Sequence, residues 1–188
     1  PMLLMIDTVN GFWPNEGSKK LGLLRAEKKV NANEWFFKAH FFQDPVQPGS
    51  LGIEAMIQLV QFYILHKNKH QSIKNPYFEP LETNEALTWK YRGQVVPTNN
   101  TVNILIDILE EGTDANGFPY VKTNASLWVD SKRIYEAKNL GMRVRSSQHP
   151  ACLHQRYCKE KLQDDIEIDI SHIEKLRKEL TPLSTFDE

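Results

Sequence analysis

The chain has little of what would mark a secreted, nucleic-acid-binding or membrane protein. Its only two cysteines, Cys152 and Cys158, lie in a polar segment and do not resemble a disulfide framework. The net charge of −1 gives no basic excess for binding nucleic acid or an anionic membrane. No apolar run reaches the roughly 18 residues that a membrane span needs, and no secretion signal opens the chain. We therefore expect a soluble, cytoplasmic protein that binds neither nucleic acid nor membrane.

The composition is that of a globular protein with a real core. Of its 188 residues, 40% are hydrophobic and 25% are charged, which is close to the average for such proteins. This length predicts one domain with an appended segment. We place the domain at residues 1–144, because the sequence from 145 to 188 is charged and only weakly helical in pattern. That second part is interpreted as a linker or a surface helix.

Hydrophobic periodicity predicts one long helix and an antiparallel sheet. The apolar segment from Ser50 to His66 is free of helix breakers after Gly52, which favours a helix. We expect strands at 2–9 and 21–30, loops at 11–20 and 67–80, and further strands from about residue 85 onward. Period-2 alternation at 102–109, a hairpin turn at Asn116-Gly117 and a tight turn at Asp130-Ser131 support those later strands.

The predicted helix is apolar on nearly every side, so it must be covered on every side. A curved antiparallel sheet wrapped around one long central helix meets this need, which gives an α+β fold. The polar exceptions Glu54, Gln58 and Gln61 fall on one face, within about 60° of one another. Glu54 has two interpretations: it complements the positive end of the helix dipole, or, when protonated, it is a general acid.

A histidine and a stiff link precede this helix. His40 lies among aromatic residues and is either a core residue or, as a neutral imidazole, a base near pH 7. The link "DPVQPGS" is stiffened by two prolines, and its Gly49 allows close approach of a ligand to the backbone. Unpaired N–H groups at a helix N-terminus can hold an oxyanion. A base, an acid and an oxyanion site thus fall within one short stretch of sequence.

The stretch "HFFQDPVQPGSLGIEAMIQLVQFY" resembles the signature of the hotdog-fold 3-hydroxyacyl-acyl-carrier-protein dehydratases. It is similar to the 3-hydroxydecanoyl type, and closest to the dehydratase domains of polyunsaturated fatty acid and polyketide-like synthases. The frame H-F-x-x-D-P-V-x-P-G-x-L-G, followed by an acid and by a glutamine four residues later, carries the resemblance. The later stretches "WKYRGQVVPT" and "LWVDSKRIYEAKNLGMRV" also match, so the similarity covers about residues 1–144.

The resemblance implies a lyase of lipid metabolism that dehydrates 3-hydroxyacyl thioesters on acyl carrier protein to 2-enoyl thioesters. It implies His40 as the base, Glu54 as the acid, Gly49 as the amide that polarises the thioester carbonyl, and Gln58 as the support of the acid. It implies no cofactor or metal beyond the phosphopantetheine that carries the substrate. It also implies a dimer or pseudo-dimer of hotdog folds, in which His40 of one fold faces Glu54 of the other.

Two departures from the family pattern bear on function. The acid position holds Glu54, whereas the isomerising 3-hydroxydecanoyl branch has aspartate, so isomerase activity stays open. Free-standing members dock the acidic carrier with an arginine-rich hairpin, whereas this hairpin, "ILEEGTDANGFP", is acidic. A carrier tethered in the same polypeptide would not need a strong docking patch, because linkage raises its effective concentration.

Other interpretations of the sequence stay open. A hotdog thioesterase or an enoyl-CoA hydratase would share the fold, and a non-enzyme alternative is a structural hotdog that completes a pseudo-dimer. The spacing of His149, Cys152, His154 and Cys158 could suggest zinc, but it is irregular, and a solvated tail is the simpler interpretation. The sequence predicts neither the length of the acyl chain nor the choice between a homodimer and a second hotdog domain.

Overall fold

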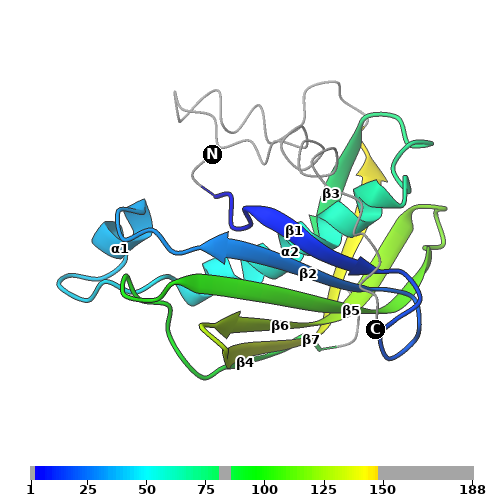
Figure 1. The fold of residues 1–188 in the computed structure, drawn as a ribbon. Helices are drawn as coiled ribbons and strands as arrows, with labels where there is room; N and C mark the ends of the chain where they lie inside the picture. The colour runs from blue at the N-terminus through cyan, green and yellow to red at the C-terminus, as the bar shows by residue number, and fades with distance from the viewer. Residues whose placement is uncertain (1–2, 81–85, 148–188) are drawn as a thin grey trace.

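The computed structural model describes residues 3–80 and 86–147 (Figure 1). Its strands are β1 (Thr8–Trp13), β2 (Leu23–Lys29), β3 (Pro76–Pro80), β4 (Thr88–Tyr91), β5 (Thr101–Thr113), β6 (Pro119–Val129) and β7 (Lys132–Ser146). Its helices are α1 (Trp35–Ala39) and α2 (Gly49–His66). The C-terminal segment predicted as a linker or surface helix lies, beyond residue 147, outside the described residues.

The strands form one antiparallel sheet in the order β1-β2-β5-β6-β7-β3, with β4 pairing β7 off this path. β7 is long enough to pair β4 through its first half, at Tyr135 to Lys138, and β3 through its second half, at Met142 to Ser146. The sheet wraps around α2, which packs against β2, β5, β6 and β7 (Figure 1). The predicted α+β architecture, a curved sheet around one long helix, is confirmed.

α2 is the centre of the hydrophobic core. Its 18 residues begin directly after Pro48, which stands at the N-cap, and the predicted helix from Ser50 to His66 is confirmed to within one residue. Side chains buried on it include Met56, Leu59 and Phe62. On β5, the alternation of buried and half-buried residues follows the period-2 pattern that predicted a strand there. Within the described ranges, no helix is long and apolar enough to cross a membrane.

Both predicted turns are present. Gly117 takes a φ of 82°, and the Asp114 carboxylate accepts hydrogen bonds from the Asn116 and Phe118 amides. The turn between β6 and β7 places Asp130 and Ser131 at φ of 46° and 80°. These positive φ values are those of tight hairpin turns.

Three elements differ from the prediction. The strand predicted at 2–9 begins only at Thr8 and continues to Trp13, because the backbone at residues 3–5 bonds to a side chain of α2 and not to the sheet. The loop predicted at 67–80 ends in β3, whose backbone pairs the end of β7. The short helix α1 lies where no element was predicted.

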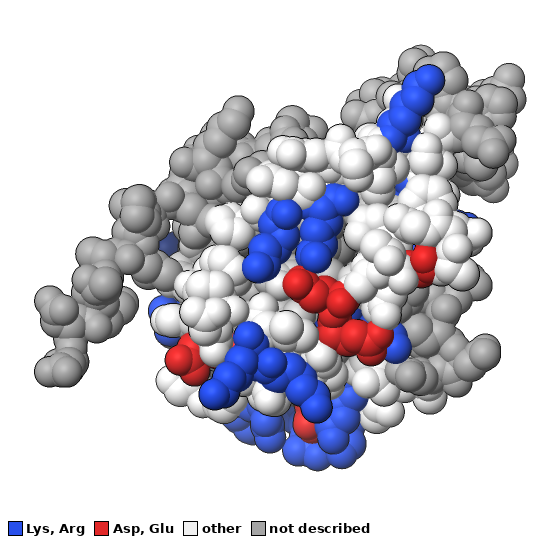
Figure 2. All heavy atoms as spheres, turned by 90° about the vertical axis from the view of Figure 1, so that its right-hand side faces the viewer, with Lys and Arg blue, Asp and Glu red and all other residues white. Residues whose placement is uncertain are grey.

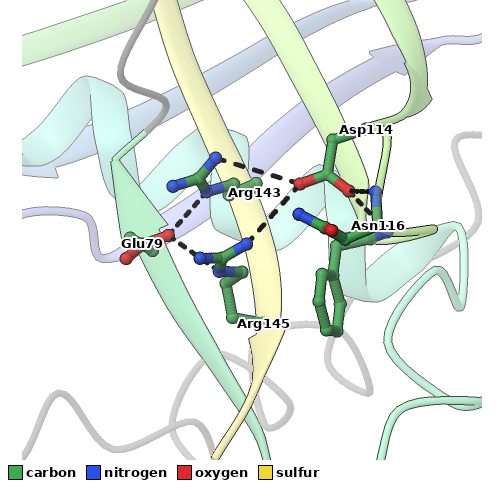
Figure 3. A network of polar contacts seen from close by, with 6 residues as sticks. Glu79, Asp114, Asn116, Arg143 and Arg145 are labelled. Carbon is green, nitrogen blue, oxygen red and sulfur yellow. Dashed lines mark hydrogen bonds and ion pairs between the residues drawn. The ribbon is translucent and has the colours of Figure 1, made fainter.

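Ion pairs connect the β5–β6 hairpin to other elements and connect its two strands to each other, and Figure 3 shows those of Asp114. Arg143 and Arg145 on β7 lie between Glu79 of β3 and Asp114 of the hairpin, with N–O distances of 2.5 and 3.2 Å to Glu79 and 3.9 and 3.7 Å to Asp114. Glu110 pairs with Lys122 at 3.3 Å, and Glu111 with Lys69 at 3.2 Å.

This end of the molecule is therefore not a free acidic patch. Each of the hairpin carboxylates at 110, 111 and 114 already has a cationic partner within the chain. Figure 2 shows acidic side chains on this face lying among Lys and Arg side chains. The hairpin is acidic in its own sequence, and the fold brings Lys and Arg side chains beside its carboxylates.

Candidate active site

Of the four predicted site residues, one caps the end of α1 and the other three lie on the first three turns of α2. His40 is the C-cap of α1, and Gly49 is the first residue of α2. Two contacts hold this arrangement in place. Lys28 of β2 forms an ion pair of 2.8 Å with Glu34 at the start of α1. The backbone N–H of Gln47 donates to the Val95 carbonyl at 3.0 Å.

His40 is held at one ring nitrogen. Its Nδ1 lies 3.1 Å from the backbone carbonyl oxygen of Val46, which can only accept a hydrogen bond. Nδ1 must therefore carry the proton, and in the neutral ring the lone pair lies on Nε2. Nε2 has no hydrogen-bond partner within residues 3–80 and 86–147. The side chain is half-buried, with the Phe41 ring 3.9 Å away between centroids. This geometry suits a base that takes a proton at Nε2.

Glu54 is held by the predicted glutamine. The Gln58 amide nitrogen donates to Glu54 Oε1 at 2.9 Å, and Gln58 is itself 2% exposed. Glu54 is half-buried one helical turn before Gln58, and its second oxygen, Oε2, has no partner among the described residues. A carboxyl group in this position can donate or accept a proton at Oε2.

Gly49 lies where two aromatic rings reach the start of α2. A Cβ atom there would stand 3.0 Å from the Tyr91 ring and 3.1 Å from the Trp89 ring. Its amide belongs to the first turn of the helix, whose N–H groups have no acceptor within the helix. Glycine thus has a packing role here beside any role of its amide in binding an oxyanion.

A third aromatic residue, which the sequence analysis did not single out, packs with these two rings at the start of α2. Tyr135 of β7 packs on Gly52, with ring centroids 4.9 Å from Tyr91 and 5.9 Å from Trp89. Burial, together with the nearby Tyr91, raises the pKa of Tyr135 above its ordinary value, so the hydroxyl stays protonated. Only the aromatic pattern on β4 and β7 could have signalled this cluster from the sequence.

The structure brings Glu54 and Gln58 together, but His40 and Glu54 share no hydrogen bond within the described chain.

The surface near His40 and near the start of α2 is unusually apolar. On the link, Phe41 is 54% and Phe42 90% exposed. On β4 and just before it, Leu87, Trp89 and Tyr91 are 41–50% exposed. Of the described strands, β4 pairs with β7 alone, so its other edge carries no strand.

A metal centre finds no support in the described part of the chain. No group of three or more His, Cys, Asp or Glu side chains there could hold an ion. The zinc alternative at His149, Cys152, His154 and Cys158 lies outside the described residues.

Comparison with known proteins bears on the family and the fold of the chain. A model of the FabA-like domain matches residues 1–138. One subunit of the polyunsaturated fatty acid synthase of Thraustochytrium sp. is 35% identical over 150 residues, which are 78% of this chain but only 9% of that protein's length. The dehydratase heterocomplex ApeI:P from Xenorhabdus doucetiae has the same fold, with a TM-score of 0.54 at 10% identity over 78% of this chain and 85% of that one.

Proposed function

The chain belongs to the FabA-like domain family, and on that premise we propose that it dehydrates 3-hydroxyacyl thioesters to 2-enoyl thioesters. The observation that carries the proposal is the state of His40. Its Nδ1 is bound to the Val46 carbonyl and its Nε2 is left without a partner in the described chain, as an acid–base catalyst requires.

The proposed reaction uses three groups of the chain. His40 Nε2 takes the proton from the carbon next to the thioester carbonyl, and the electrons of that C–H bond move toward the carbonyl oxygen. The Gly49 amide, at the positive end of α2, stabilises the negative charge on that oxygen. Glu54, protonated, gives its proton to the departing hydroxyl, so the C–O bond breaks, water leaves and the C2–C3 double bond forms. A proton passing from His40 back to Glu54 restores the enzyme.

The partner we propose is a second hotdog fold. His40 and Glu54 share no hydrogen bond among the described residues, whereas β4 has one edge that no described strand pairs and exposed aromatic side chains on it. A second fold on this edge would bring a second pair of catalytic residues to the same surface. Both a homodimer and a second domain in a longer polypeptide satisfy this requirement.

The proposed substrate is carried on the phosphopantetheine of an acyl carrier protein. The support is family membership and the relative named as part of a polyunsaturated fatty acid synthase, of which this chain matches a small share. Each hairpin carboxylate is paired with a cation of the chain, so the hairpin presents less unpaired negative charge to an acidic carrier than its own sequence contains. A carrier in the same polypeptide would be helped further by its high effective concentration.

Substitution of His40 and Glu54 tests the proposal. With 3-hydroxyacyl substrates of graded length on a carrier protein, we expect each of His40→Ala and Glu54→Ala to lower kcat by about 10²–10⁴-fold. His70→Ala, in the turn after α2, is the matched control and should keep turnover within about threefold of native, because His70 lies beside Leu65 and Phe78, at the opposite end of α2 from Gly49. Mass spectrometry of the carrier-bound product, with the position of its double bond, is the measurement.

The products separate the rival activities. Loss of the mass of one water molecule from the carrier-bound acyl group supports dehydration, whereas release of a free acid would show a thioesterase. Turnover of coenzyme A thioesters alone would favour a hydratase. A His40→Ala protein with full dehydratase activity would contradict the proposed base.

A further inference from the structure

The side chain of Gln58 makes hydrogen bonds to three different partners and uses both of its donor hydrogens. Its Oε1 accepts from the Met5 amide at 2.9 Å. Its Nε2 donates one hydrogen to the Leu3 carbonyl at 2.7 Å and the other to Glu54 Oε1 at 2.9 Å. Two of these partners belong to the N-terminal segment, residues 3–7, which lies far from Gln58 in sequence.

The two backbone partners determine the direction of the third hydrogen bond. A backbone N–H can only donate and a backbone carbonyl can only accept, so the Gln58 amide has one permitted orientation. The oxygen of the amide must face Met5 and its NH₂ must face Leu3 and Glu54. Glu54 Oε1 is therefore always an acceptor, whether the carboxyl group is protonated or not.

The N-terminal segment is itself firmly placed. Met5 and Ile6 are 2% and 0% exposed, so their side chains belong to the core. The Asp7 amide donates to the Glu27 carbonyl at 2.9 Å, and the Asp7 carboxylate accepts from the Lys29 amide at 2.8 Å. The segment is thus fixed to β2 at one end and to α2 at the other.

We infer that the N-terminal segment, acting through Gln58, selects the oxygen of Glu54 that carries the reacting proton. Because Oε1 is held as an acceptor, the proton is on Oε2, the oxygen that is left without a partner in the described chain. Leu3 and Met5 are then positioning residues through their backbone groups. This inference rests on the proposed function for the meaning of the proton, but its hydrogen bonds can be tested without turnover.

The test without turnover is nuclear magnetic resonance of the Gln58 side-chain NH₂. With both hydrogens bonded in a buried site, we expect them to exchange with solvent at least about tenfold more slowly than those of the exposed Gln94. Met5→Pro removes the N–H that orients the amide, and should raise the exchange rate of the Gln58 NH₂ severalfold. Leu4→Pro, one residue earlier, is the control for the backbone change and should raise it less.

The test with turnover compares two glutamine-to-glutamate changes on the same helix. Gln58→Glu keeps an acceptor for Met5 but removes the donor to Glu54, so we expect kcat to fall about 10²-fold with KM changed less than about threefold. Gln61→Glu places a similar carboxyl group one turn away, in a residue as buried as Gln58, and should leave kcat within about threefold of native. Thermal melts of both variants verify the fold.

The outcomes separate this inference from the proposed function. Equal losses of kcat in the two glutamate variants, or a Gln58 NH₂ that exchanges as fast as that of Gln94, would overturn the inference and leave the dehydratase proposal standing. Slow exchange that Met5→Pro abolishes, in a protein without dehydratase turnover, would retain the positioning and reject the function.

Discussion

At the scale of single residues, the first turns of α2 depend on two glycines for different reasons. A Cβ atom on Gly52 would overlap the ring of Tyr135, which is 1% exposed and enclosed on its other sides. A Cβ atom on Gly49 would meet Tyr91 and Trp89, whose rings are 45% and 41% exposed. The buried ring has no room to move, whereas the exposed rings do.

Alanine substitution should therefore separate the two glycines. For Gly52→Ala we expect overpacking against the buried ring to cost about 3 kcal/mol of unfolding free energy, which exceeds the gain of roughly 1 kcal/mol that alanine brings to a helix. Gly49→Ala should change the free energy of unfolding by less than about 0.5 kcal/mol. Urea unfolding of both variants is the measurement, and equal losses would contradict the role of Tyr135.

At the scale of elements, the C-terminal half of α2 is joined to β5 by a partly buried hydrogen bond. The Tyr63 hydroxyl, in a side chain 0% exposed, lies 2.8 Å from Glu111 Oε2, and Lys69 pairs with the same carboxylate. Burial raises the pKa of Glu111, but the hydrogen bonds from Tyr63 and Lys69 outweigh it, so the pKa is lowered from its ordinary value of 4.5. The lowered pKa means that the charged form stabilises the fold.

The free energy of unfolding should then decrease as the pH is lowered below 4.5. A carboxyl group whose pKa is lowered by folding contributes its full stability above the unfolded value of 4.5 and loses it as the pH falls further. Tyr63→Phe removes one of the groups that lower the pKa of Glu111. We expect it to cost about 1–2 kcal/mol at pH 7 and to reduce the difference in unfolding free energy between pH 7 and pH 3.

Urea titrations at the two pH values measure both effects. Tyr120→Phe is the matched control, because the Tyr120 hydroxyl donates to Glu110, the exposed neighbour of Glu111 on β5. Tyr120→Phe should change the free energy of unfolding, and its dependence on pH, by less than Tyr63→Phe does. A Tyr63→Phe protein with native stability at both pH values would contradict the proposed coupling.

The sequence predicted those elements whose signals are local. β5, β6 and β7 were predicted because apolar alternation and turn residues such as Asn116-Gly117 occur within a few positions of one another. β1 was misplaced because a bulge between Val9 and Gly11 interrupts its alternation. β3 was missed because it has prolines at both ends, which an edge strand tolerates and a sequence pattern does not reveal.

The candidate site likewise has a part that is local in sequence and a part that is not. His40, Gly49, Glu54 and Gln58 fall within one short motif, so a family resemblance could identify them. The partners of these residues come from far along the chain: Leu3 and Met5 for Gln58, and β4 for Gly49. No periodicity or spacing in a single sequence predicts contacts between such distant positions, and their discovery needed the fold.

At the scale of the whole molecule, the edge of β4 that no described strand pairs determines how the site could be completed. The Arg92 amide donates to Ile134 on β7, and antiparallel strands alternate the direction of their amides. The amides of Trp89 and Tyr91 therefore point away from β7, toward the open edge. An edge with outward amides and exposed aromatic side chains is suited to pairing with another strand.

If two copies pair on this edge and each site takes His40 from one copy and Glu54 from the other, two inactive variants should restore activity when mixed. A heterodimer of His40→Ala with Glu54→Ala has one site with both residues intact. Random pairing of equal amounts makes half of the dimers mixed, so we expect about a quarter of native turnover. Co-expression with two different tags, followed by sequential purification, gives the mixed dimers directly.

The β4 edge can be tested in the same mixture. Trp89→Lys in both variants puts a charge on the edge and should abolish the recovery of activity and shift the protein toward monomers in analytical ultracentrifugation. Thr8→Lys, on the opposite edge strand β1, is the matched control and should leave both unchanged. Purified mixed dimers without activity, made from two copies with native folds, would instead place each site within a single copy. A native chain that stays monomeric would assign the second fold to another domain.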